Sequence, residues 1–567
     1  MVGPAPGDSL EAAETRESSA RDIGEAMAAN GGLWKLRKGG IANDVVLRGF
    51  QSKDLNVLID GQRIYGACPN HMDPPAFHAD FSEVDRIEIG KGPFDVRNQG
   101  SLGGVINIVT QQPEPGWHAS GNLSDGSFGF VNPSATASYG SGRFSALGGY
   151  SYRRSQPHVD GTGKRFTQYA NFRTDAVESD AFRVGTFWGK FTAVPAKNHL
   201  AQVSYARQQA DHVLYPYLQM DAIYDDADRV NVAYRIDGLS GLVDSLRFQG
   251  YFTRVNHWMT DQYRVSSAGM AREYSMGTMA QTKTFGGRAE SGMRSITLGV
   301  ETFRRQWTAT TMMAGMAYKP QYSIPDVETD SIGIYAEYQK PLSDQLKLDL
   351  GGRFDLARSA ADPSKANTDL YYSYNSTRLV SANDTLSSGS ARVSYVSRNG
   401  LELSGVVGHA SRLPEPQERF LALRRSGSDW VGNPTLSPGR HLSVSGDLSF
   451  VRGSQESGRY LPEIPPLTSR AGIRYDTGRV FAEVEGVFVA AQRRVDVELR
   501  EEPTPGYGVA NLRLGADYRR LSIRGGVNNL LNRAYYEHLS YQRDPFRTGT
   551  RVFEAGRNFF INLACRF

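Results

Sequence analysis

Apolar and polar residues alternate with a period of two over most of the chain. From about residue 118 to residue 567 the pattern recurs, as in 332–338 and 346–350. Because successive side chains of a β-strand point to opposite faces, it predicts strands with one apolar and one polar face. Short turns join them, as between 512–518 and 521–523. No helical pattern of comparable length interrupts this region, so we expect a large antiparallel sheet.

The last strand helps to decide between a soluble sandwich and a membrane barrel. One face of residues 559–567 is apolar, and the chain ends on Phe567. Such endings resemble the assembly signal of bacterial outer-membrane barrels, although an ordinary strand can end on Phe by chance. An uninterrupted apolar stretch of about 18 residues, as a spanning helix requires, is missing from the sequence. We therefore predict a transmembrane β-barrel of about 22 strands.

The first part of the chain follows a different pattern. A short helix is expected near 22–29, and apolar runs at 45–47, 56–60, 84–89 and 105–110 are separated by Gly and Pro. This mixture predicts a small α/β unit. A polar stretch with two prolines follows at 112–116. We place the boundary there, with an α/β domain over 1–115 and the barrel over 116–567.

Composition excludes several classes of function. The net charge of +4 is too small to suggest a nucleic-acid partner. The only two cysteines, Cys68 and Cys565, lie almost at opposite ends of the chain, which argues against a disulfide-built fold. A phosphate-binding loop would need a Gly-Lys-Ser/Thr element, which we do not find among the glycines. Because no Ser/His/Asp or paired-carboxylate arrangement rises above background, we do not expect an enzyme.

Five motifs of the first domain occur in the order and spacing of the plug of TonB-dependent receptors, and the segment 527–533 is similar to a late-barrel signature of that family. The motifs are Val46-Leu-Arg-Gly-Phe50, Val57-Leu-Ile-Asp-Gly61, Val84-Asp-Arg-Ile-Glu-Ile89, Lys91-Gly-Pro93 and Gly103-Gly-Val-Ile-Asn-Ile108. The resemblance implies an N-terminal plug inside a barrel of the bacterial outer membrane, surrounded by lipid and lipopolysaccharide. It also implies active import driven by the TonB-ExbB-ExbD complex. We expect a monomer.

A Pro-bounded loop of the expected plug, residues 66–75, contains Cys68 and Met72 among polar neighbours. Packing is the usual role of such residues, but the neighbouring residues of this loop offer few apolar side chains for Cys68 and Met72 to pack against. His257 and Met259 share the polar parity of their strand, so both should point into the lumen, near the outer end because a long polar segment follows to about Lys283. Thiolate, thioethers and imidazole form a soft donor set that selects Cu(I).

Cys-x-x-x-Met in the plug with His-x-Met in the barrel is similar to the outer-membrane copper receptors of the OprC/NosA type. That resemblance implies a copper ion, preferentially Cu(I), as the bound substrate of Cys68, Met72, His257 and Met259. Methionines cluster between residues 220 and 316, which fits a vestibule that collects copper but also fits compositional drift in surface loops. Nine of the 12 lie there: Met220, Met259, Met270, Met276, Met279, Met293, Met312, Met313 and Met316.

Other interpretations stay open. A receptor for a siderophore or another metal chelate would hold its ligand with aromatic and Arg side chains and would not need Cys68. A passive pore or adhesin would bind no metal tightly. The acidic stretch with Asp221, Asp225, Asp226 and Asp228 lacks the glycine and terminal glutamate of a regular calcium loop, so we interpret it as a solvated extracellular turn.

Overall fold

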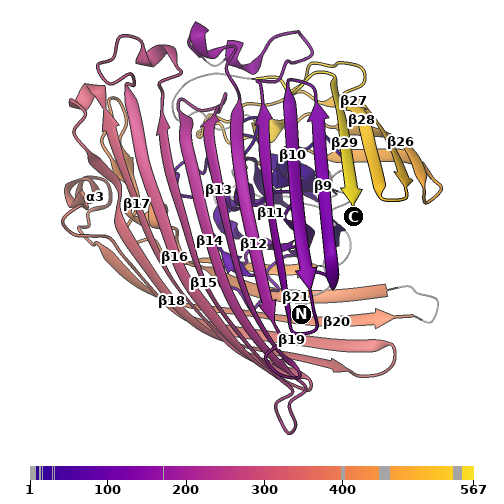
Figure 1. Cartoon of the computed structure of the whole chain (residues 1–567). Coiled ribbons are helices and arrows are strands. Elements are labelled where there is room, and N and C mark those ends of the chain that lie inside the picture. The colour runs from indigo at the N-terminus through magenta and orange to yellow at the C-terminus, as the bar shows by residue number, and fades with distance from the viewer. Residues whose placement is uncertain are drawn as a thin grey trace.

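The computed structural model describes residues 8–11, 15, 17–28, 30, 32–169, 171–397, 402–445, 460–540 and 552–567, to which the structural statements below refer. A closed antiparallel barrel surrounds a small α/β unit, which we call the plug (Figure 1). The predicted fold class is confirmed. Within the described ranges no helix has the length and apolarity needed to cross a membrane.

The plug is built on a five-stranded sheet in the order β1-β7-β8-β5-β6, in which β5 and β8 are parallel. A three-stranded sheet, β2-β3-β4, and one short helix complete it. Its elements are β1 (Asp8–Glu11), α2 (Ile23–Met27), β2 (Leu33–Leu36), β3 (Asp44–Leu47), β4 (Phe50–Gln51), η1 (Ser52–Asp54), β5 (Leu55–Ile59), β6 (Gln62–Arg63), η2 (Pro75–His78), β7 (Val84–Lys91) and β8 (Gly104–Thr110). The four strands expected from apolar runs are thus present.

The helix begins where the sequence predicts it. Asp22 is its N-cap, and the carboxylate accepts a hydrogen bond of 2.7 Å from the Glu25 N–H, which satisfies one of the free donors of the first turn. The helix is shorter than expected, because it ends at Met27 rather than near residue 29.

In the described part of the chain, 19 strands form the barrel, against the prediction of about 22 for the whole chain. They are β9 (Gly116–Gly126), β10 (Phe130–Gly140), β11 (Phe144–Ser155), β12 (Phe182–Ala193), β13 (His199–Val213), β14 (Asp221–Asp237), β15 (Ser245–Thr260), β16 (Met276–Met293), β17 (Ile296–Met313), β18 (Gln321–Pro341), β19 (Leu346–Ala360), β20 (Ser381–Val396), β21 (Glu402–Arg412), β24 (Gly439–Ser445), β25 (Thr468–Asp476), β26 (Val480–Val489), β27 (Tyr507–Tyr518), β28 (Leu521–Asn528) and β29 (Asn558–Arg566).

The last strand closes the barrel by pairing antiparallel with the first. Between the strands lie α3 (Thr368–Asn375), α4 (Pro416–Phe420), β22 (Ala422–Leu423) and β23 (Trp430–Val431). The plug sheet ends at Thr110 and the barrel begins at Gly116, so our proposed division between residues 115 and 116 falls in the connection.

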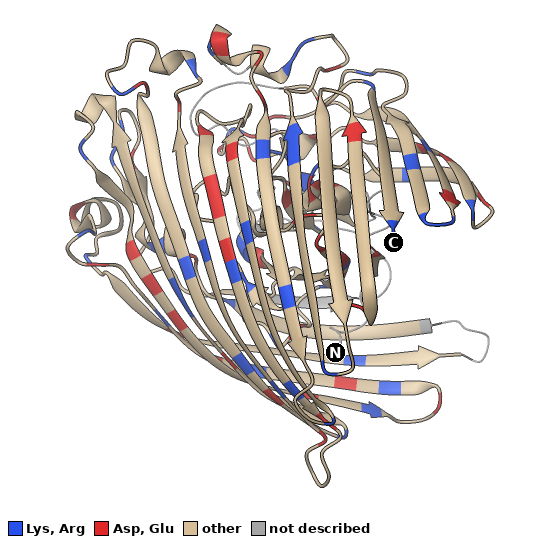
Figure 2. Ribbon diagram, in the orientation of Figure 1, with Lys and Arg blue, Asp and Glu red and all other residues tan. Residues whose placement is uncertain are grey.

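The alternating residues of the barrel strands point to two different surroundings, as the sequence predicted. On β18, Ile332 and Ile334 are 52% and 62% exposed, whereas Tyr335 on the other parity is 4% exposed. The exposed apolar side chains form the surface that meets lipid, and the inner face meets the plug. Basic and acidic residues are interspersed along the strands and loops (Figure 2), in keeping with the small net charge.

Loop lengths distinguish the two ends of the barrel. At one end the strands are joined by short turns such as 238–244 and 294–295, and at the other by longer loops such as 156–181 and 361–380. Short turns are periplasmic and long loops extracellular in such barrels. The loop after β15 is shorter than expected, because β16 already begins at Met276. His257 and Met259 nevertheless lie near the extracellular end of β15.

The largest apolar core lies where the plug meets the barrel wall. It joins buried plug residues such as Ile59 and Ile108 to buried wall residues such as Val255 and Trp307. Burial of these side chains on both sides seats the plug against β15 and β17. The loop with Cys68 and Met72 is therefore held beside the strand with His257 and Met259.

Candidate metal centre

The plug loop 66–75 folds around one carboxylate. Asp73 accepts hydrogen bonds from the backbone N–H groups of Ala67, at 2.6 Å, and Cys68, at 3.0 Å. Gly66 allows this close approach, because a Cβ atom there would lie 2.3 Å from the Asp73 carbonyl oxygen. A turn bond of 3.0 Å from the His71 N–H to the Cys68 carbonyl tightens the loop. Cys68 is thereby held in one position.

Three buried side chains from outside the loop fix its carbonyl groups. Tyr215 and Trp307 are donors from the barrel, and Lys38 is a donor from the plug. Trp307 Nε1 donates to the Ala67 carbonyl at 2.7 Å, the Tyr215 hydroxyl to the Met72 carbonyl at 2.7 Å, and Lys38 Nζ to the carbonyls of Asn70, at 3.3 Å, and His71. The loop is thus ordered by contacts that the sequence did not reveal.

The barrel supplies the facing side chains. His257 and Met259 both lie on the lumenal face of β15 and are 0% and 1% exposed. Met259 Sδ lies 3.5 Å from Cys68 Sγ, so plug and barrel meet through their sulfur atoms. Two sulfurs bound to one ion through bonds of about 2.3 Å lie roughly 3.5–4.5 Å apart. This pair is therefore spaced as two ligands of one ion would be.

Met72 belongs to the same buried cluster as Cys68 and Met259. The loop residue Asp73 lies beside the His257 ring: its Oδ2 atom lies 4.0 Å from His257 Nδ1. The structure thus brings the three sulfur residues into one cluster and connects His257 to it by a shared carboxylate. The role of the four residues as ligands remains our proposal.

The ring of His257 is oriented by Asp225, whose Oδ2 lies 2.8 Å from His257 Nδ1. Nε2 is buried and has no hydrogen-bond partner among the described residues. A carboxylate that accepts from one ring nitrogen leaves the lone pair of the other available, which is the usual arrangement around a metal-binding histidine.

Burial sets the protonation state of two side chains of the loop, Cys68 and Asp73. It raises the pKa of the Cys68 thiol above its ordinary value, and the neighbouring Asp73 adds to the shift. Burial also raises the pKa of Asp73 to about 7, against the opposing effect of His257. The metal-free loop therefore contains a neutral thiol, and an ion that binds to sulfur must displace its proton.

The interpretation of the acidic stretch as a solvated turn is wrong, because its residues belong to β14 and pair with β15. Asp221 is buried against Arg264, at 2.6 Å, and Asp225 is the direct cross-strand partner of His257. Sequence reasoning missed this role of Asp225, although strand pairing of the segment with 245–260 would have placed it opposite His257.

Methionines line two cavities above the loop. Met220, Met259 and Met276 share a cavity of about 20 Å³ with Pro69 and Asn70. Met276 also lines an outer cavity of about 620 Å³, together with Met313 and Met316. Not every methionine of the 220–316 segment takes part, because Met279 lies on the outer parity of β16 and is 51% exposed.

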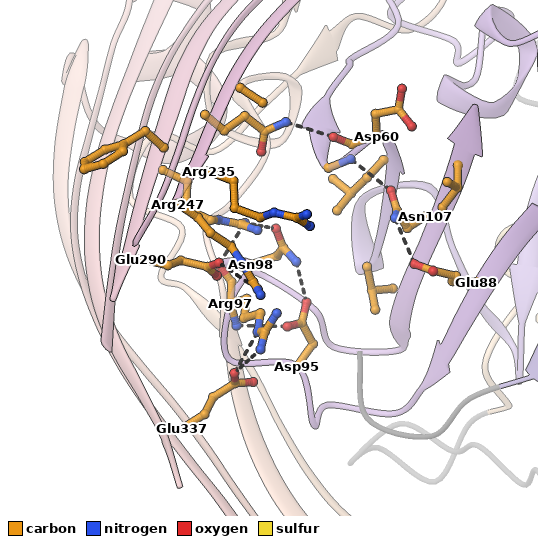
Figure 3. Close-up of a pocket in the computed structure, with 18 of the residues that line it drawn as sticks. Asp60, Glu88, Asp95, Arg97, Asn98, Asn107, Arg235, Arg247, Glu290 and Glu337 are labelled. Atoms are coloured by element: carbon orange, nitrogen blue, oxygen red, sulfur yellow. Dashed lines mark hydrogen bonds and ion pairs between the residues drawn. The ribbon is translucent and has the colours of Figure 1, made fainter. Parts of the chain in front are cut away.

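A third cavity, of about 650 Å³, lies between the plug and the wall near the short turns, and none of the four candidate ligands lines it. Figure 3 shows its charged lining, including the Arg97–Glu337 pair, at 2.5 Å, and Asn107, which donates to Glu88 at 3.0 Å. Ion pairs and amides of this kind suit a hydrated passage better than a soft-metal site.

Two family models together match most of the sequence. The family model "TonB-dependent Receptor Plug Domain" matches residues 3–105, and "TonB dependent receptor-like, beta-barrel" matches residues 122–440 and 426–530. The "Iron-regulated outer membrane virulence protein" of Vibrio cholerae is 29% identical over 110 residues, which is 18% of this chain and 17% of that protein. The chain thus aligns with less than a fifth of that relative.

Solved structures share the fold. The "Copper transporter OprC" superposes with a TM-score of 0.83 at 20% identity, over 99% of this chain and 97% of that one. The ferric yersiniabactin uptake receptor FyuA from Yersinia pestis gives a TM-score of 0.69 at 14% identity, over 99% and 98%. The FrpB iron transporter from Neisseria meningitidis gives 0.69 at 14%, over 99% of both chains.

These likenesses show the architecture, and they include receptors named for copper and for iron. Plug and barrel models together match most of the sequence, in the same order as the two parts of the structure. The chain belongs to the TonB-dependent receptors of the bacterial outer membrane, a family that works with the TonB energy-transducing system.

Proposed function

We propose that this receptor binds a copper ion, preferentially Cu(I), between plug and barrel and imports it into the periplasm. Cys68 and Met72 from the plug and His257 and Met259 from β15 are the proposed ligands. The observation that carries the proposal is the 3.5 Å contact between Cys68 Sγ and Met259 Sδ, which joins the two halves of the set.

The donor types favour copper over other metals. Thiolate and thioether ligands select Cu(I), whereas Zn²⁺ sites contain more Cys and His and no Met. Cys68 is the only anionic ligand of the set, so its thiolate partly neutralises the ion in a site where every donor is buried. The neutral thioethers should contribute less to affinity than Cys68.

The methionine cavities support a route from outside. The outer cavity carries Met276, Met313 and Met316, the inner one Met220, Met259 and Met276, and Met276 lines both. Thioethers spaced in this way can pass a soft ion inward while holding it weakly. On the other side of the site, the cavity of Figure 3 offers the released ion a space with charged side chains in its lining, near the periplasm.

Transport would be driven by the TonB-ExbB-ExbD complex, which we expect to act on the plug. We also propose that the protein is a monomer in contact with lipid and lipopolysaccharide, and that it catalyses no reaction. Passive leakage is not expected, because plug and wall share a continuous buried core.

The test is metal binding by the purified protein in detergent under reducing conditions. Ag⁺, which air does not oxidise, serves as a substitute for Cu(I) and is titrated separately into reduced protein from which the reductant has been removed. We expect one ion per chain for the wild type, a loss of affinity of more than about a hundredfold for Cys68→Ala, and about tenfold losses for Met72→Ala and Met259→Ala, with His257→Ala between these limits.

The matched control is Cys565→Ala, which removes the other free cysteine, on β29, a strand that lies between β28 and β9 and does not neighbour β15. It should leave stoichiometry and affinity unchanged. Unaltered binding of one ion by Cys68→Ala would disprove the assignment of the ligands.

A metal chelate is the second candidate. The outer cavity of about 620 Å³ has the size that small organic ligands fill, and Arg264 and Arg425 are part of its lining. A chelate would be recognised there and would not depend on Cys68. Binding of a ferric chelate with equal affinity by wild type and Cys68→Ala would favour this candidate.

A further inference from the structure

A second group of metal-binding donors lies beside the sulfur cluster, on the Nδ1 side of His257. Asp73, Asp225 and His257 each present one donor atom, and these atoms all lie within 4.8 Å of one another. The three side chains are 0%, 1% and 0% exposed. Two carboxylates and an imidazole are donors that borderline and hard divalent ions prefer, and Cu(I) does not.

An independent feature points to the same place. His78, at the end of η2 in the plug, is 0% exposed; among the described residues neither of its ring nitrogens makes a hydrogen bond of good geometry, although the ring interacts with the Asp73 backbone. Its Nδ1 lies 3.6 Å from Asp225 Oδ1, which makes no such bond within the described ranges either. Buried polar atoms of this kind are rare and costly unless something binds them.

The two carboxyl groups also lack a Lys or Arg partner. Among the described residues no Lys or Arg lies within 4.0 Å of the Asp73 or Asp225 carboxyl group, whose neighbours are backbone N–H groups, His257, His78 and each other. Asp221, on the same strand, is by contrast paired with Arg264 at 2.6 Å. Two buried carboxyl groups without a countercharge cannot both be ionised, and a divalent cation would allow both to bind it as carboxylates.

Distances between the donors suit such an ion after small shifts. Bonds of about 2.0–2.2 Å place neighbouring N and O ligands roughly 3.0–3.6 Å apart. His78 Nδ1 is 3.6 Å from Asp225 Oδ1, and His257 Nδ1 is 4.0 Å from Asp73 Oδ2. The plug contributes Asp73 and His78, and the barrel contributes Asp225 and His257, so an ion here would also tie plug to wall.

We propose that Asp73, Asp225 and His257 Nδ1, with His78 as a further donor, form a binding site for a divalent cation of the Zn²⁺ and Cu²⁺ class. The site goes beyond the proposed Cu(I) function, because it uses neither Cys68 nor a thioether. It shares only His257, which has one lone pair as a neutral imidazole: either Nδ1 binds the divalent ion and Nε2 is protonated, or Nε2 binds Cu(I) and Nδ1–H donates to Asp225. The soft monovalent ion and the harder divalent ion therefore compete for this one side chain.

The experiment compares Zn²⁺ and Ag⁺ titrations of the full chain in detergent. Asp225→Asn keeps an oxygen that can accept from His257 Nδ1–H but removes the anionic donor, and His78→Gln keeps most of the side-chain volume. Both variants should weaken Zn²⁺ binding by at least about tenfold. His78→Gln should change Ag⁺ binding by less than about threefold, whereas Asp225→Asn should also weaken Ag⁺ binding by up to about tenfold, because Asp225 orients the His257 ring. Cys68→Ala should show the reverse, with Ag⁺ affinity lost and one Zn²⁺ still bound.

Asp226→Asn is the matched control, since it makes the same change at the next position of β14, on the opposite face of the strand. It should alter neither titration. Retained Ag⁺ binding and heat-modifiable migration in gels verify that each variant is folded.

Unchanged Zn²⁺ affinity in both His78→Gln and Asp225→Asn would overturn the proposal, as would loss of both ions together in Cys68→Ala. A different result would separate the two proposals. If the wild type failed to bind Ag⁺ but bound Zn²⁺ in a way that depended on His78 and Asp225, the copper function would be contradicted and the divalent site supported.

Discussion

At the scale of single residues, the chemistry of the site depends on burial. Cys68 is 2% exposed, and burial raises the pKa of its thiol, so the thiol is protonated at neutral pH in the metal-free protein. Only the thiolate binds a metal ion well. Metal binding and proton release at Cys68 are therefore linked.

This linkage predicts a pH dependence. Below the raised pKa of Cys68, each ion bound displaces one proton, so affinity should increase by about tenfold for each unit of rising pH between 6 and 8. Ag⁺ titrations at pH 6, 7 and 8 measure the slope. Cys68→Ala should bind weakly with a much smaller slope. A wild-type affinity independent of pH would show that the Cys68 thiol does not lose its proton on binding.

At the scale of elements, the loop 66–75 is a preformed support for two sulfurs. Asp73 holds the start of the loop, and Gly66 leaves room for it. The backbone geometry of this loop, rather than the identity of Cys68 and Met72 alone, sets the direction in which the sulfurs point.

Gly66→Ala tests this support. The added Cβ would lie 2.3 Å from the Asp73 carbonyl oxygen and 2.6 Å from Asp73 Oδ1, so the loop must shift. We expect Ag⁺ affinity to fall by about tenfold or more while the barrel remains folded, measured by titration and by gel migration. Gly250→Ala is the control on β15, because no atom lies within 4 Å of its added Cβ. Equal behaviour of the two variants would contradict a supporting role of the loop.

At the scale of the whole molecule, a buried ion cluster ties the plug to the wall. Glu301 on β17 lies 3.1 Å from Arg63 of the plug and 3.2 Å and 2.9 Å from Arg288 and Arg353 of the barrel. Arg63 and Glu301 are 4% and 3% exposed. Three guanidinium groups thus share one carboxylate in a buried place.

Glu301→Gln should loosen the plug, because it leaves Arg63 of the plug and Arg288 of the barrel without their anion, while Arg353 keeps Asp355. Loss of one partner of a buried pair costs about 3 kcal/mol or more, which corresponds to roughly a hundredfold faster hydrogen exchange of plug amides in β8. Hydrogen exchange followed by mass spectrometry measures the change. Glu328→Gln, at the exposed Arg304 pair, should leave exchange as in the wild type. Unchanged exchange in Glu301→Gln would show that the apolar core alone holds the plug.

The sequence determined the architecture and the four candidate ligands. Side chains along a strand point alternately to its two faces. Local alternation of apolar and polar residues was therefore enough to place His257 and Met259 on the lumenal face of β15. Motif order was enough to predict the plug, since each motif is a short continuous segment. Loop chemistry was enough to single out Cys68 and Met72. All of these are local properties of the chain.

Only the tertiary structure decided the surroundings of those ligands. The pairing of Asp225 with His257 depends on the register of β14 against β15, and the approach of Met259 to Cys68 depends on the seating of the plug. His78 and Asp73 reach the same place from a loop whose path the sequence pattern does not fix. Contacts between residues far apart in the chain follow from long-range packing, which no local period encodes; for this reason the acidic stretch was misread and the carboxylates beside His257 appeared only in the fold.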